Sequence, residues 1–233
     1  MSNRNLILVS GGLDSAVLLR FMQLTNRGGP DDVVEAVTFD YGQRHLTELK
    51  AAQAICGWAG VTQHIVEAKM FFGDSCLDPA SITPPQECYT EDNMMLTVVP
   101  NRNMILLALA GGLALSRGLT GLAYAAHAGD HSVYPDCRPE FIQAMRTAFK
   151  LSHYDGGLEL YTPLSRKQKW EVVQLGAEVG VPFGLTYSCY AGGELHCGVC
   201  ATCRERKNAF EVAGVVDPTQ YAAAAAPVAA EVK

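Results

Sequence analysis

The stretch from Ser10 to Ser15, with the sequence SGGLDS, brings two adjacent glycines, two hydroxyls and one carboxylate into one short turn. An apolar run at 6–9 precedes it and an apolar helical pattern at 16–19 follows it, so a strand is expected to pass through this turn into a helix. Glycines let the backbone approach a ligand closely, and amide N–H groups at a helix start favour an anion such as phosphate. The glycines alone also fit a plain turn before a helix. The complete string, with Asp14 and both hydroxyls as side-chain ligands, predicts a phosphate-binding turn.

Four of the eight cysteines lie in one short segment, at Cys189, Cys197, Cys200 and Cys203, with the spacing CxxxxxxxCxxCxxC. Disulfides are not expected in a chain without a visible secretory signal. Four thiolates at this spacing can surround one zinc ion tetrahedrally, and such a site is structural because no coordination position stays open. An iron–sulfur cluster is the alternative, although the bacterial ferredoxin run CxxCxxCxxxCP is not matched. Both predict a bound metal, whereas four unrelated buried thiols would bind none.

The composition indicates which partners to expect. With 233 residues, 48% of them hydrophobic, the chain can bury one sizeable core and carry a small appendage. The net charge of −6 disfavours nucleic acid as a partner, because domains that bind nucleic acid usually carry a basic face. The longest apolar helix candidate, 104–115, is interrupted by glycines and is shorter than the roughly 20 residues that span a bilayer. We therefore expect a cytoplasmic protein that acts on small molecules, without nucleic acid or a membrane as a partner.

Apolar, β-branched runs alternate along the chain with segments of helical period. Strands are expected at 5–9, 33–39, 62–67, 121–125 and 158–161, and helices near 13–26, 43–59, 102–116, 138–151 and 166–179. Such alternation predicts an α/β fold in which a parallel, Rossmann-like sheet is flanked by helices. In these sheets ligands bind outside the carboxyl ends of the strands, so the residues that follow each strand are candidates for a site.

Polar residues stand where the expected strands end and the helices begin. Tyr41 and Gln43 follow the second strand and offer a ring and an amide to a purine-like base, although a solvated helix cap fits them equally. Arg102 and Lys169 each lie at the start of a helix, where a cation opposes the helix dipole unless it meets an anionic partner. A solvated side chain is the alternative for both.

Three other stretches differ in composition from the elements around them. The connection 127–140 is rich in ionisable groups beside glycine and proline, which indicates a site loop that includes Asp136 and Arg138. The proline-rich, polar stretch 72–100 is too long for an ordinary connection and is predicted to be a lid or insertion loop. The alanine-rich end, 222–233, is predicted to be a disordered tail.

Taken together, these motifs resemble the 7-cyano-7-deazaguanine synthase (QueC) family of the PP-loop ATP pyrophosphatases. The string SGGLDS is shared across PP-loop enzymes, and the lysine motif GxxxxGK[ST] of the P-loop NTPases is absent from the sequence. More specific strings cover almost the whole chain: DYGQRH at 40–45, VPNRN at 99–103, YPDCRPEF at 134–141, TPL at 162–164 with Lys169, and SCY at 188–190 followed by CGVC at 197–200 and Cys203. One departure is Ala16, where the family often has Ser or Thr.

The resemblance implies an adenine nucleotide α-hydrolase-like, ATP-binding domain over 1–185 and a zinc-binding Cys₄ region over 186–221. It also implies a ligase of queuosine or deazapurine biosynthesis that converts 7-carboxy-7-deazaguanine and ammonium to 7-cyano-7-deazaguanine with ATP and Mg²⁺. The carboxylate and then the amide oxygen would each be adenylated, because neither oxygen leaves readily by itself. A homodimer is implied as well.

Roles for single residues follow from the same resemblance. The residues assigned to catalysis are Asp14, Ser15, Arg102 and Lys169. The residues assigned to ATP are Leu8, Val9, Ser10, Gly11, Gly12, Leu13, Asp14, Ser15, Ala16, Val17 and Leu18. The residues assigned to the deazapurine are Tyr41, Gln43, Asp136 and Arg138. Zinc would be bound by Cys189, Cys197, Cys200 and Cys203.

Three other functions remain open at this stage. A PP-loop transferase that modifies a tRNA base would bind a large polyanion, which the acidic balance of the chain disfavours. A related enzyme that attaches the deazapurine acyl group to another amine would share the activation step and differ only in the nucleophile. A zinc-stabilised nucleotide-binding module without catalysis is disfavoured because Asp14 and both hydroxyls of the turn are present.

Overall fold

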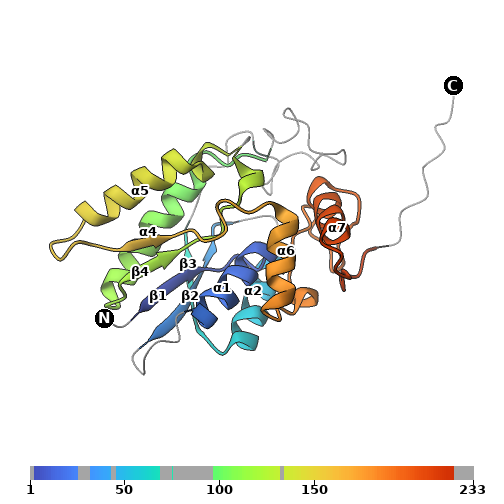
Figure 1. Ribbon diagram of the computed structural model, residues 1–233, viewed down its shortest axis with the longest axis horizontal. Helices are drawn as coiled ribbons and strands as arrows, with labels where there is room; N and C mark the ends of the chain where they lie inside the picture. Colours follow the sequence, from blue (N-terminus) through green and yellow to red (C-terminus); the bar gives the residue numbers. More distant parts are fainter. Residues whose placement is uncertain are drawn as a thin grey trace, which may run out of the picture.

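The computed structural model describes residues 3–25, 32–42, 46–68, 75, 97–131 and 134–222. Within these residues lies a five-stranded sheet in which every pair of neighbouring strands is parallel (Figure 1). The strand order is β3-β2-β1-β4-β5, and the bounds are β1 Arg4–Leu8, β2 Val33–Asp40, β3 Thr62–Glu67, β4 Gly121–Ala123 and β5 Glu159–Tyr161. The predicted α/β class with a parallel, Rossmann-like sheet is confirmed.

Helices cover both faces of the sheet and make a three-layer arrangement (Figure 1). Their bounds are α1 Leu13–Thr25, α2 Leu46–Ala59, α4 Arg102–Ser116, α5 Pro139–Leu151, α6 Lys169–Glu178 and α7 Ala201–Ala213. Side chains alternate between the two faces of a strand, so Ile7 joins the core under α1, α2 and α6 while its neighbour Leu6 joins the core under α4 and α5. Both faces are therefore buried, as is usual for a parallel sheet between helices.

Most expected bounds lie within one residue of the observed ones, and those of β4 and α6 differ by more. β4 ends at Ala123, two residues before the expected end at 125. The helix expected from 166 begins at Lys169 instead, because the backbone N–H of Gln168 donates to Glu171 Oε2 at 2.7 Å and caps the first turn. The cap thus decides where α6 starts and brings Lys169 to its first position.

Helix α7 lies inside the cysteine segment, where the sequence did not predict a helix. Its buried face mixes apolar residues with Cys203 and Arg206, so it shows no clean apolar stripe of helical period. The helix ends at Gly214, which has a φ of 67°, the left-handed conformation that commonly closes helices.

The order of the strands creates a switch point at the centre of the sheet. From β1 the sheet extends through β2 and β3 on one side and through β4 and β5 on the other. Connections from β1 and β4 therefore leave in opposite directions and open a crevice at their carboxyl ends, where ligands of such folds bind. The turn after β1 is the SGGLDS string.

Some sequence predictions fall mainly outside the described residues. Of the stretch 72–100, predicted to be a lid, only Ser75 and residues 97–100 are described, and of the predicted tail 222–233 only Ala222. Gln43 also lies outside the described residues. In the part of the chain that the structure describes, no helix combines the length and the apolar character needed to cross a membrane.

Candidate active site

The turn between β1 and α1 depends on glycine at position 11. Gly11 has a φ of 90°, which other residues rarely adopt. A Cβ at this position would collide with the carbonyl oxygen of Glu48 and lie 2.7 Å from the amide nitrogen of Ala52. Glycine therefore lets α2 pack directly against the turn. From the other side, the N–H of Tyr187 donates to the carbonyl oxygen of Gly11 at 2.9 Å.

The two serines of the turn hold its shape from within. Ser15 Oγ donates to the carbonyl oxygen of Gly12 at 3.0 Å and accepts the N–H of Ser10 at 3.2 Å. Ser10 Oγ accepts the N–H of Gly12 at 3.3 Å. These bonds preorganise a loop whose amides lie at the positive end of the α1 dipole.

Asp14 lies in the first turn of α1 and uses only one of its two oxygens. Lys169 Nζ donates to Asp14 Oδ2 at 2.6 Å, and His127 Nε2 lies 4.0 Å from the same oxygen. Burial raises the pKa of the Asp14 carboxyl, but Lys169 and His127 outweigh burial and bring the pKa below its usual value. The other oxygen, Oδ1, is buried and accepts no hydrogen bond from the described residues. A buried carboxylate oxygen of this kind is suited to a cation or to a donor on a ligand.

Lys169, the first residue of α6, meets a second carboxylate, because Glu205 Oε2 on α7 lies 3.7 Å from its Nζ. Burial lowers the pKa of the Lys169 ammonium, yet Asp14 and Glu205 outweigh burial and raise the pKa above its ordinary value. The ammonium group is therefore charged at neutral pH. The sequence pattern predicted an anionic ligand to offset the positive charge of Lys169 at a helix start. In the structure, the carboxylates of Asp14 and Glu205 supply part of that negative charge.

His127 and Asp130 belong to the connection after β4 and hold one another in place. His127 Nδ1 accepts the N–H of Gly129 at 3.1 Å, and Asp130 Oδ2 accepts the N–H of His127 at 3.3 Å. The other ring nitrogen, Nε2, faces Lys169 Nζ at 3.4 Å, Asp130 Oδ1 at 3.5 Å and Asp14 Oδ2 at 4.0 Å. We call the group Asp14, His127, Asp130 and Lys169 the ionic end of the site.

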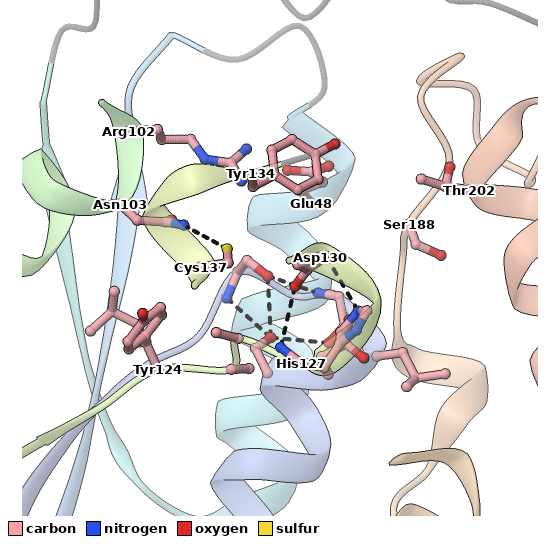
Figure 2. A pocket seen from close by; sticks show the side chains of 18 of the residues that line it. Glu48, Arg102, Asn103, Tyr124, His127, Asp130, Tyr134, Cys137, Ser188 and Thr202 are labelled. Atoms are coloured by element: carbon pink, nitrogen blue, oxygen red, sulfur yellow. Dashed lines mark hydrogen bonds and ion pairs between the residues drawn. The ribbon is translucent and has the colours of Figure 1, made fainter. Parts of the chain in front are cut away.

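A cavity of about 310 Å³ opens at the carboxyl ends of β1, β2 and β4 and includes the ionic end in its wall. At its other end lie Tyr41, Glu48, Arg102, Tyr134 and Tyr190, which we call the aromatic end. Figure 2 shows Arg102, Tyr134 and Glu48 close together at this end, away from His127 and Asp130. The cavity is thus polar at both ends, with an ion-pair network at one and phenol rings at the other.

Arg102, the first residue of α4, lies in the cavity wall among phenol groups. Burial lowers the pKa of its guanidinium, but Tyr41, Tyr134 and Tyr190 outweigh burial and raise the pKa above its ordinary value. Arg102 donates a hydrogen bond to the hydroxyl oxygen of Tyr41. The side chain therefore does not extend into solvent, which was the alternative left open by the sequence.

Asp136 lies beside the cavity and not in its wall. Its Oδ2 accepts the N–H of Asn103 at 2.9 Å, in the first turn of α4. The residue at the usual capping position, Asn101, has a φ of 57° and makes no side-chain cap bond, so Asp136 supplies a carboxylate at the helix start instead. This contact serves the fold, and the role of Asp136 in binding the deazapurine stays a prediction.

Other residues assigned to ligands also lie outside the cavity wall. Arg138 Nε donates to the carbonyl oxygen of His131 at 2.8 Å, and Arg138 does not line the cavity. Val17 and Leu18 are fully buried in the core between α1 and the sheet, because α1 packs on it there. Of the residues assigned to ATP, those that line the cavity are Leu8, Val9, Ser10, Gly12, Leu13, Asp14 and Ser15. Gly11 and Ala16 do not line it.

The four cysteines of the C-terminal segment come together in space. The Sγ atoms of Cys189, Cys197, Cys200 and Cys203 all lie within 4.8 Å of one another, and none forms a disulfide. The Cys189–Cys200 and Cys197–Cys203 sulfur pairs are both 4.0 Å apart. Zinc–sulfur bonds of about 2.3 Å in a tetrahedron place the sulfurs about 3.8 Å apart, close to this spacing. The predicted cluster is confirmed as a set of side chains that could hold one metal ion.

Backbone amides and a buried arginine hold this segment to the rest of the protein. The N–H of Cys197 donates to Cys189 Sγ at 3.2 Å, and the N–H of Cys200 donates to Cys197 Sγ at 3.3 Å. Arg206, 2% exposed, donates to Thr186 Oγ1 at 2.8 Å and pairs with Asp217 at 3.2 Å. The segment also contributes residues to the cavity wall, among them Ser188 and Thr202 (Figure 2).

Sequence reasoning did not single out Glu48, Tyr124 or Glu205, although all three line the cavity. Tyr124 directly follows β4, so its position at a strand end was a usable signal. Its hydroxyl is buried without a hydrogen-bond partner among the described residues. Glu48 and Glu205 lie on helices, and nothing in the sequence around them indicates that they face a cavity.

The parallel sheet, the SGGLDS turn at its switch point and the cavity above it define an α/β protein of the PP-loop type. The fold is similar to that of U34-tRNA thiolase NcsA from Methanococcus maripaludis, with a TM-score of 0.52 and 16% sequence identity. The match covers 91% of this chain and 64% of that one. At this identity the likeness concerns the fold alone.

The chain belongs to the QueC family, as the motifs predicted. A family model described as "Queuosine biosynthesis protein QueC" matches residues 4–214. The 7-cyano-7-deazaguanine synthase of Caldicellulosiruptor bescii is 42% identical over 220 residues, which are 94% of this chain and 97% of that protein. The 7-cyano-7-deazaguanine synthase of Pseudoalteromonas translucida is 41% identical over 226 residues, 95% of this chain and 100% of that protein.

Proposed function

We propose that this protein converts 7-carboxy-7-deazaguanine, ammonia and ATP to 7-cyano-7-deazaguanine, as a ligase of queuosine or deazapurine biosynthesis. The observation that carries the proposal is the 42% identity to a protein named for this activity over 94% of the chain. A phosphate-binding turn that opens into a cavity of about 310 Å³ is consistent with it.

The chemistry requires two activations, because a carboxylate becomes a nitrile only by losing both oxygens. In the first, a carboxylate oxygen attacks the α-phosphorus of ATP and pyrophosphate leaves. Ammonia then attacks the acyl carbon, and AMP leaves with a proton released, which gives an amide. The amide oxygen attacks a second ATP in the same way, and loss of AMP and a proton gives the nitrile. Each nitrile formed therefore accounts for two ATP, two AMP and two pyrophosphate molecules.

The ionic end is the part of the cavity that suits pyrophosphate. The amides of the turn and the charged Lys169 stabilise the negative charge that develops as pyrophosphate leaves. Ser10 and Ser15 keep the turn in its binding conformation through their hydrogen bonds. Arg102, at the aromatic end, is placed to hold an anionic group of the deazapurine or the adenylate. These residues position and neutralise anions, and that is the main need of phosphoryl chemistry.

A Mg²⁺ ion fits beside Asp14, because Oδ1 of this ionised carboxylate is buried and has no partner among the described residues. Such an ion would neutralise phosphate charge. The cysteine cluster fits a structural Zn²⁺, since its four sulfurs leave no open coordination position. The boundaries 1–185 for the ATP-binding domain and 186–221 for the zinc region stay predictions.

The test is to incubate the purified protein with 7-carboxy-7-deazaguanine, ATP, Mg²⁺ and ammonium and to identify the products by mass. We expect the nitrile, with two AMP and two pyrophosphate molecules for each. ADP and phosphate in place of AMP and pyrophosphate would contradict the proposal. A tRNA-modifying activity would instead appear as turnover of tRNA without conversion of the free base. An amide-linked adduct formed when a peptide amine replaces ammonium would favour acyl transfer to another acceptor.

A homodimer and a cytoplasmic location are proposed from the family resemblance. Light scattering behind size-exclusion chromatography measures the first, and a mass near 25 kDa, that of one chain, would contradict it. Fractionation of cells that produce the protein measures the second.

A further inference from the structure

Glu48 occupies a fixed position at the aromatic end of the cavity. It lies in the first turn of α2, and its carbonyl oxygen packs so closely against Gly11 that no Cβ would fit between them. The phosphate-binding turn and α2 therefore hold one another in place. Its side chain lines the cavity beside Tyr134 and Arg102 (Figure 2).

The carboxylate of Glu48 accepts no hydrogen bond from the described residues, and Arg102 is the cation that lowers its pKa. Burial raises the pKa of Glu48 to about 7, while Arg102 opposes this effect. A half-buried acceptor without a donor is costly unless a ligand supplies one. The cavity thus contains two carboxylate oxygens to which no described residue donates a hydrogen bond.

The surroundings of Glu48 favour a planar ligand. Tyr41, Tyr134 and Tyr190 line the same end of the cavity, and phenol rings pack well against flat heterocycles. The phosphate-binding turn and Lys169 lie at the other end. A base at the aromatic end would therefore lie apart from the phosphate groups.

We propose that Glu48 is the specificity-determining residue for the deazapurine, and that its two carboxylate oxygens accept hydrogen bonds from the ring N1–H and the 2-amino group of a guanine-type edge. This assignment rests on the proposed function. A guanine-type edge presents two adjacent donors, which match the two oxygens of one carboxylate. Adenine presents a donor beside an acceptor, so the same carboxylate repels one position of the adenine edge. Glu48 thereby directs the deazaguanine, and not the adenine of ATP, to this end.

The assignment also sets the pH dependence of binding. The ionised form accepts both donors, so affinity for 7-carboxy-7-deazaguanine should rise with pH through about 7, the pKa of Glu48. Among the described residues, the charged and titratable groups that face Glu48 are Arg102 from α4, Tyr41 after β2, Tyr134 from the connection after β4 and Tyr187 before the cysteine segment. Burial raises the pKa of all three tyrosines, so none titrates near pH 7.

The test compares 7-carboxy-7-deazaguanine with its analogue that lacks the 2-amino group, by calorimetric binding and by kcat/KM. Wild-type protein should prefer the amino compound by about 10- to 100-fold, the effect of one hydrogen bond to a charged acceptor. Glu48→Gln keeps the shape of the side chain and should reduce this preference to within about 3-fold. Glu205→Gln removes the same charge at the ionic end, and is expected to lower activity with both compounds while leaving the preference intact.

The outcomes separate the two proposals. Wild-type protein that neither binds nor converts 7-carboxy-7-deazaguanine would overturn the proposed function and, with it, the role of Glu48. Wild-type turnover without a preference for the 2-amino group would overturn the role of Glu48 alone. An unchanged preference in Glu48→Gln, with kcat lowered equally for both compounds, would also overturn it and indicate a proton-transfer role instead.

Discussion

Two carboxylates of this protein lie at opposite ends of the same sheet, and each meets one basic side chain and one histidine. They differ in whether both carboxylate oxygens have a partner. Asp14, beyond the carboxyl end of β1, meets Lys169 and His127. Glu35, near the start of β2, meets Arg117 at 2.6 Å and His64 at 2.7 Å. Both oxygens of Glu35 are bonded, because Arg117 Nη2 also donates to Oε1 at 3.3 Å.

The difference between the two is the unused oxygen of Asp14. Asp14 Oδ1 is buried without a partner among the described residues, while the Glu35 carboxylate is complete within the protein. Native proteins rarely leave buried acceptors unpaired, and this one belongs to a residue of the cavity wall, where a ligand could supply the partner. An ion pair by itself therefore does not separate a functional site from a structural one, whereas an unpaired oxygen that also faces a cavity favours a functional role.

The comparison predicts opposite results for the two carboxylates. Asp14→Asn keeps the shape of the side chain but removes the charge at the unused oxygen, so pyrophosphate release should fall by about 10³-fold or more. The melting temperature should change little, because Lys169 keeps Glu205 as a partner. A pyrophosphate assay and a thermal melt measure both effects. The matched control is Asp155→Asn at an exposed residue, which should leave activity and melting temperature unchanged. Activity retained in Asp14→Asn would contradict a functional role of the unpaired Asp14 oxygen.

The cysteine cluster can be compared in the same way, because its four sulfurs would all have a partner once a metal ion is bound. Cys200→Ser should lower the bound zinc and reduce the free energy of unfolding by about 3 kcal/mol, because metal binding contributes to folding. Metal analysis and denaturant unfolding measure the two effects. Cys56→Ala, at a buried cysteine of α2 outside the cluster, serves as the control and should leave the metal content unchanged. Wild-type protein that is stable without metal would contradict a structural role.

Glu35→Gln should affect stability and leave activity intact. One charge-assisted partner is lost, but Arg117 is 40% exposed and can be rehydrated, so the free energy of unfolding should fall by only about 1 kcal/mol. Turnover should remain within about 2-fold of wild type, since Glu35 does not line the cavity. A larger fall in turnover would mean that the ion pairs of Glu35 with Arg117 and His64 also support the active site.

The smallest expected effect is the dependence on acid pH of the stability that Glu35 contributes. The hydrogen bond from Arg117 lowers the pKa of Glu35, burial opposes it, and His64 lowers the pKa further, so the folded value lies below the ordinary 4.5. The unfolded chain therefore takes up the proton first as the pH falls, and the contribution of Glu35 is present above pH 4.5 and is lost below it. The difference in unfolding free energy between wild type and Glu35→Gln should be constant near neutral pH and shrink below 4.5. A difference that persists in acid would contradict an ionic origin.

The two motifs that are local in the sequence could be located from it. The turn of Ser10 to Ser15 and the cysteines of 189–203 each concentrate their chemistry within a short segment, and the alternation of apolar runs predicted the parallel sheet. The resemblance to the QueC family rests on the same contiguous strings, and the family comparison confirmed it. Helix α7 escaped prediction because its buried face includes Arg206 and Cys203.

Residues whose role depends on distant partners could not be assigned in this way. The hydrogen bond by which Asp136 caps the start of α4 could not be found from the sequence, because it joins residues 33 positions apart. Glu48 gave no signal and faces the cavity only because α2 packs against Gly11.

The sequence by itself determined the class of sheet, the glycine turn after the first strand, the grouping of four cysteines and the family, because these depend on the order and spacing of neighbouring residues. The tertiary structure alone decided which polar atoms are paired and which described atoms have no partner. Lys169 reaches Asp14 across 155 positions, and Arg117 reaches Glu35 across 82, through contacts that only the packing of helices on the sheet creates. The physical reason is that pairing depends on distance in space, which local sequence pattern does not specify.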